Sequence, residues 1–149
     1  MQGDGMRDRI IRFLQRVANV VLPLESRQNS QLSQRSLYFH YRELLLQGWE
    51  LPSFRDTGFR VYSQSDEDGL LLYLFSLIGF KNRLIVDIAA GAPIGGNATN
   101  LIVNWGCNAL LVEGSSKLLE ETASFYRRNP DTQLFPPKAR QAWVTVENQ

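Results

Sequence analysis

Two short apolar runs, each ended by an acidic residue, dominate the hydrophobic pattern of the chain. Residues 84–86 are followed by Asp87, and residues 109–112 are followed by Glu113. Continuous apolar runs are typical of strands in parallel sheets, and parallel strands need a crossover connection of about this length. The pattern predicts a strand, a loop, a short helix and a second strand.

The loop between these runs has the composition of a ligand-binding turn. It contains three glycines within residues 91–96, and glycine lets the backbone approach a ligand closely. A helix beginning near Asn97 or Thr99 would direct its free N–H groups to the same place. Both acids would lie at the carboxyl ends of their strands, where open α/β sheets bind ligands. An acid about 20 residues after such a loop is the usual partner of ribose hydroxyls. These features predict a site for an adenosine-containing cofactor.

The remaining hydrophobic periodicity predicts four further helices, a linker and a third strand. Residues 6–22 have an apolar side opposite an arginine side, which favours a docked helix with a solvated basic face over a membrane-surface helix. The polar residues 25–36 are interpreted as a linker. The other predicted elements are helices over 37–47, from Ser65 or Asp66 to 78, and over 117–128, and a strand over 142–146.

Composition narrows the chemistry. With 16 basic and 15 acidic residues, the net charge of +1 gives no field that would favour nucleic acid. One cysteine excludes an intramolecular disulfide framework, and a reducing, cytoplasmic location is the simplest interpretation. One histidine rules out a two-histidine metal site, so no metal is expected. No apolar run is long enough for a membrane span, and arginines interrupt the apolar residues near the N-terminus, so no signal peptide is expected.

At residues 87–93, DIAAGAP, the chain resembles motif I of class I S-adenosylmethionine-dependent methyltransferases. More narrowly, it resembles the FkbM family in the segments 63–69, 97–101, 104–106 and 111–114. Ala89 and Pro93 stand where the family pattern usually has glycine.

The resemblance implies S-adenosyl-L-methionine as cofactor and transfer of its methyl group to a hydroxyl of a small molecule or glycan. Asp87 and the Gly91 loop would hold the methionine part, and Glu113 the ribose hydroxyls. Gln64 and Glu67 would border the pocket. The full set of expected cofactor-binding residues is Asp87, Ala89, Gly91, Asn97, Glu113, Gly114 and Asn148. No catalytic base can be named.

The fold class expected from this resemblance is α/β, a Rossmann-like methyltransferase sheet incomplete at its C-terminus. Residues 1–58 would form a helical extension, and residues 59–149 the N-terminal half of the methyltransferase domain. The strand at 84–88 would then lie at an open edge of the sheet, which natural proteins avoid. We therefore expect self-association or a partner that completes the sheet, and the activity of this chain alone stays open.

Two alternatives remain open. One is an NAD-binding Rossmann oxidoreductase fragment, against which the missing G-x-G-x-x-G spacing argues. The other is a non-catalytic remnant or interaction module that keeps the fold without the ligand. Pro93, which lacks a backbone N–H, favours this second alternative.

Overall fold

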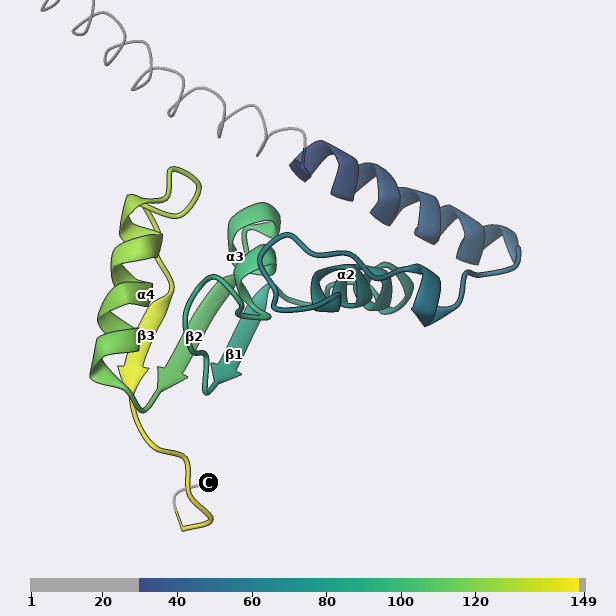
Figure 1. Ribbon diagram of the computed structural model, residues 1–149. Helices are drawn as coiled ribbons and strands as arrows, with labels where there is room; N and C mark the ends of the chain where they lie inside the picture. The colour runs from purple at the N-terminus through teal and green to yellow at the C-terminus, as the bar shows by residue number, and fades with distance from the viewer. Residues whose placement is uncertain (1–29, 148–149) are drawn as a thin grey trace, which may run out of the picture. The chain divides into compact units, whose positions relative to one another are not determined.

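The computed structural model describes residues 30–147 of the chain (Figure 1). A helix covers residues 30–47, and seven labelled elements follow it. They are the 3-10 helix η1 (Phe54–Asp56), α2 (Glu67–Ile78), β1 (Leu84–Ile88), α3 (Thr99–Trp105), β2 (Asn108–Glu113), α4 (Ser116–Arg128) and β3 (Lys138–Gln141).

The three strands form one parallel sheet in the order β1-β2-β3 (Figure 1). Ile85 is level with Ala109, and Leu111 with Ala139. The α/β class with a small parallel sheet is thus as expected, and so is the position of β1 at an edge. Because the Arg83 carbonyl accepts from Asn108 N–H, alternation along the strand turns the backbone groups of Val86 and Ile88 toward the open edge.

Both crossover helices pack against the same face of the sheet. Ile102 and Val103 of α3 and Tyr126 of α4 form one buried cluster with Ala109 and Leu111 of β2. Two successive crossovers in the same direction place their helices on one face when both are right-handed. Among residues 30–147, no helix covers the other face of the sheet in this way.

A second apolar cluster joins α2 to the far end of α3. Leu72 and Trp105 are buried there, and Phe80 stacks between Phe75 and Trp105 with ring centroids 4.5 and 5.7 Å apart. Tyr38 also contacts Trp105, with ring centroids 5.2 Å apart. The apolar sequence of α2 is therefore buried along one side, whereas Ile78 remains exposed.

Local signals explain most helix ends. The Ser115 hydroxyl accepts a hydrogen bond from Leu118 N–H and caps α4, as its position before an amphipathic run predicts. Gly79 follows α2 with a positive φ of 78°. Asp66 is the N-cap residue of α2 and Glu67 and Asp68 lie in its first turn, as predicted, although the Asp66 side chain makes no capping hydrogen bond.

Two sequence-based assignments are wrong. Residues 30–36 are helical, not a linker, because Gln, Leu and Arg have good helix propensity and the segment continues into the helix that ends at residue 47. The third strand is Lys138–Gln141, not residues 142–146, because pairing with β2 ends at Gln141. Its four residues are all exposed, and their sequence carries no hydrophobic alternation.

Contacts group residues 37–149 into one compact unit, separate from residues 1–36. The expected boundary after residue 58 stays a prediction. The amphipathic segment 6–22 and Asn148 lie outside the described residues. Between residues 30 and 147, no helix combines the length and apolar character needed to cross a membrane.

Candidate functional site

A polar pocket of about 550 Å³ opens at the carboxyl end of β1. Asp87 and the loop that follows β1 line it, and its rim is formed by Gln64, three residues before α2, and Glu67, the first residue of α2. The twelve lining residues are Gln64, Glu67, Asp87, Ile88, Ala89, Ala90, Gly91, Ala92, Ile94, Gly95, Gly96 and Asn97. The fold thus brings residues 64–67 next to residues 87–97, although α2 and β1 lie between them in sequence.

Asp87 is the half-buried acid of the pocket. It lies on the helix-covered face of the sheet, in line with Ile85. Burial raises the pKa of Asp87, and a hydrogen bond from the backbone of Ala98, just before α3, opposes this rise. A carboxylate that lacks water on one side gains more than usual from a cationic or hydrogen-bond-donating ligand.

The peptide groups of Gly91 are fixed from both sides. Gly91 N–H donates to Oε2 of Glu113 at 2.9 Å, and the Gly91 carbonyl accepts from the Thr122 hydroxyl at 3.0 Å. The second oxygen of Glu113 accepts from Ser115 N–H at 2.8 Å. These hydrogen bonds, led by those from Ser115 and Gly91, lower the pKa of Glu113. Glu113 therefore ties the loop after β1 to the loop after β2.

The opposite side of the loop is held by a buried acid, Asp68. Its Oδ2 atom accepts hydrogen bonds from three successive N–H groups, those of Val61, Tyr62 and Ser63, at 2.7, 2.6 and 2.9 Å. The Tyr62 carbonyl in turn accepts from Gly95 N–H at 2.7 Å. Asp68 is 1% exposed, so it acts on the pocket through this backbone segment and not by touching a ligand.

Below the loop, two hydroxyls form a buried relay. Thr99 donates to the Pro93 carbonyl at 2.7 Å, so it must accept the hydrogen bond that joins it to the Tyr126 hydroxyl at 3.0 Å. Burial is the main cause that raises the pKa of Tyr126 to about 12; the Thr99 hydrogen bond opposes the rise and the charge of Asp87 adds to it. Tyr126 is thus a neutral anchor for the loop at physiological pH.

Four of the expected cofactor-binding residues line the pocket: Asp87, Ala89, Gly91 and Asn97. Glu113 and Gly114 are not among the lining residues. Glu113 instead accepts a hydrogen bond from Gly91 of the loop, and the Trp143 ring lies against Gly114. The sequence did not predict that Asp68, Thr122 and Tyr126 hold the pocket loop and its neighbouring segment in place. The sequence singles out Asp68 only as an acid followed by glycine at the start of a strongly apolar helix. That pattern does not show that Asp68 accepts hydrogen bonds from residues 61–63.

Ala89 adopts a left-handed backbone conformation, with φ of 59°. It is the one non-glycine residue with positive φ among the described residues. We expect Ala89→Gly to stabilise the protein by about 0.5–1 kcal/mol, because a Cβ in this conformation costs about 1–2 kcal/mol and glycine's extra chain entropy recovers part of it. Urea denaturation measures the change, and a destabilised variant would contradict the assigned conformation.

No group of three His, Cys, Asp or Glu side chains within residues 30–147 is placed to hold a metal ion. Comparison with protein-family models finds no matching family, and neither the curated proteins nor the solved structures provide a match. Functional inference therefore rests on the pocket itself.

Proposed function

We propose that the pocket at the end of β1 binds S-adenosyl-L-methionine and that the protein is a methyltransferase of the FkbM type. The observation that carries the proposal is the convergence of Asp87, the loop after β1 and the rim residues Gln64 and Glu67 on one polar pocket at a strand's carboxyl end. The sequence resemblance assigns cofactor binding to this same loop.

The chemistry of the lining fits such a cofactor. The cofactor carries an ammonium group and a sulfonium, and the pocket offers the carboxylates of Asp87 and Glu67. Hydrogen bonds from the backbone N–H groups of Glu67 itself and of Ser65 lower the pKa of Glu67, which keeps it anionic. The volume of about 550 Å³ is within the usual range for small-molecule sites.

In the proposed reaction, the bound cofactor supplies an electrophilic methyl group. That methyl group would pass to the hydroxyl oxygen of the acceptor, leaving S-adenosylhomocysteine, and the hydroxyl proton would leave to solvent or a base. Asp87 and the Gly91 loop position the methionine part, and Glu113 keeps that loop in place. The protein's contribution is mainly orientation of the two reactants. The acceptor is proposed to be a hydroxyl of a small molecule or glycan.

Isothermal titration of the full chain with S-adenosylhomocysteine tests the proposal, with NAD as the comparison ligand. We expect selective binding of S-adenosylhomocysteine. In Asp87→Asn, binding should weaken at least about tenfold, because a charge-assisted hydrogen bond contributes about 1.5–3 kcal/mol. The unliganded variant should be slightly more stable than the parent, because burial disfavours the charged form of Asp87.

Asp131→Asn serves as the matched control, since Asp131 is exposed beyond the end of α4 and distant in sequence from the pocket loop. This variant should bind like the parent. Preference for NAD would favour the dinucleotide-binding alternative, and a folded chain that binds neither ligand would favour the non-catalytic one. Unchanged binding in Asp87→Asn would remove Asp87 from the site.

A further inference from the structure

The face of the sheet that α3 and α4 leave bare is apolar on two strands and basic on the third. Leu84, Val86 and Ile88 of β1 are 69%, 65% and 56% exposed. The register places Leu110 and Val112 of β2 beside them; Leu110 is partly exposed, whereas Val112 is buried, so the open part of this face lies over β1 and the beginning of β2. The register then places the exposed residues Lys138 and Arg140 of β3 level with these two β2 residues.

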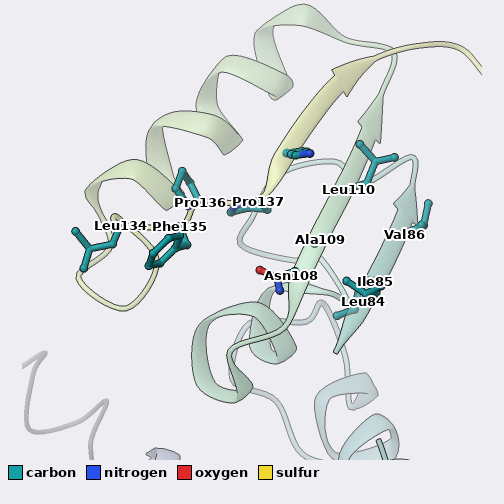
Figure 2. Close-up of a pocket in the computed structure, with 11 residues that line it drawn as sticks. Leu84, Ile85, Val86, Asn108, Ala109, Leu110, Leu134, Phe135, Pro136 and Pro137 are labelled. Atoms are coloured by element: carbon teal, nitrogen blue, oxygen red, sulfur yellow. The ribbon is translucent and has the colours of Figure 1, made fainter. Parts of the chain in front are cut away.

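This bare face is hollowed into a groove of about 650 Å³ (Figure 2). Figure 2 shows the beginnings of β1 and β2 on one side and the loop 134–137 on the other. Leu84, Val86 and Leu110 contribute to its lining, as does Lys138. The lining is mainly apolar, and a concave apolar surface of this size suits inserted side chains better than it suits water.

The positive charges on this face favour an acidic binding partner over a second copy of the chain or its own basic segment. No acidic residue belongs to the bare face of the three strands, and neither Lys138 nor Arg140 has an ion-pair partner among residues 30–147. A second copy would therefore bring the same uncompensated cations to the contact. The chain's own segment 6–22 contains four arginines and one aspartate, so its charge is also unfavourable.

We propose that the bare face is a docking site for an amphipathic helix of another polypeptide, with acidic residues along one flank. Parallel sheets are normally covered by helices on both faces, and within residues 30–147 helices cover only one face of this sheet. In this arrangement the apolar side chains of the docked helix lie over β1 and β2 and contact Val86 and Leu110. Its acidic flank faces Lys138 and Arg140 on β3. A flat lipid surface, in contrast, would leave the groove unfilled.

Two synthetic amphipathic peptides with the same leucine stripe test this proposal. One carries glutamates along its flanks, and its twin carries lysines at the same positions. Fluorescence anisotropy with the full-length chain should show the glutamate peptide binding about tenfold tighter than the lysine peptide, from two exposed charge pairs. The double variant K138E/R140E should reverse this preference. Because both side chains are exposed, this variant should fold normally, which circular dichroism verifies.

The control is the double variant K117E/R127E, which makes the same change of charge on α4, against the other face of the sheet. It should retain the parent's preference for the glutamate peptide. Equal affinity for both peptides, or binding of neither, overturns the proposal. Binding to phosphatidylserine vesicles but to neither peptide would indicate a lipid surface instead. Self-association that K138E/R140E leaves intact and that competes with the peptides would indicate a second copy.

Discussion

Asp68→Ala should destabilise the protein by about 3–5 kcal/mol. The substitution leaves the N–H groups of Val61, Tyr62 and Ser63 without their acceptor. Ser63 is buried and Tyr62 partly buried, and each buried, unsatisfied donor costs about 1–3 kcal/mol, whereas water can reach the exposed Val61. This is a large share of the 5–15 kcal/mol that keeps a typical domain folded. Urea denaturation followed by circular dichroism measures the loss.

Asp66→Ala is the matched control for Asp68→Ala, because Asp66 is exposed two residues away and its side chain makes no capping hydrogen bond. It should cost less than about 1 kcal/mol, the usual limit for an acid near a helix N-terminus. Asp68→Asn retains the shape and one acceptor oxygen, so it should fall between the two. If Asp68→Ala were no more harmful than Asp66→Ala, the three hydrogen bonds would contribute nothing net.

Gly69→Ala should destabilise the protein by about 2 kcal/mol, although alanine is the better helix former. A Cβ at this position would lie 2.3 Å from the Phe59 nitrogen and 2.4 Å from the Thr57 oxygen, both backbone atoms that cannot rotate away. Alanine gains about 1 kcal/mol over glycine inside a helix, but overpacking of this kind costs about 1–3 kcal/mol or more. It also threatens the hydrogen bond from Gly69 N–H to the Phe59 carbonyl, 3.0 Å long. Thermal and urea denaturation measure the balance.

Gly48→Ala separates the clash from conformational strain. Gly48 has φ of 67° but no atom within 4 Å of an added Cβ, so its substitution should cost about 0.5–1 kcal/mol, the backbone strain less the chain entropy that alanine saves. The two variants should also perturb different regions of the protein. In NMR spectra, Gly69→Ala should shift the amide signals of residues 57–63, and Gly48→Ala should not. A neutral or stabilising Gly69→Ala would mean that α2 and the segment before it are not in close contact.

The sequence was sufficient to predict those elements whose structure is decided by their own residues. The apolar runs before Asp87 and Glu113 form the predicted parallel strands, and a serine before an amphipathic run begins α4. The pocket loop was found for the same reason, because its glycines and the adjoining acid are consecutive in sequence. Such features need no knowledge of distant neighbours.

The sequence failed where distant neighbours decide. Strand β3 reads Lys-Ala-Arg-Gln and is a strand because β2 offers it an edge, and its register with β2 ends at Gln141, before the alternating residues 142–146. Glu113 was expected to face a ribose, but its two oxygens are engaged by Gly91 and Ser115, 22 and 2 residues away. Its ribose role stays a prediction. Hydrogen bonds of this kind depend on how the loops meet after folding.

The open edge of β1 has a consequence for the life of this protein in a cell. Its outward backbone groups at Val86 and Ile88 can pair with any extended chain, whatever the sequence of that chain. Such pairing with unrelated chains is how misassociation begins, and chaperones and proteases act on chains that expose an edge of this kind.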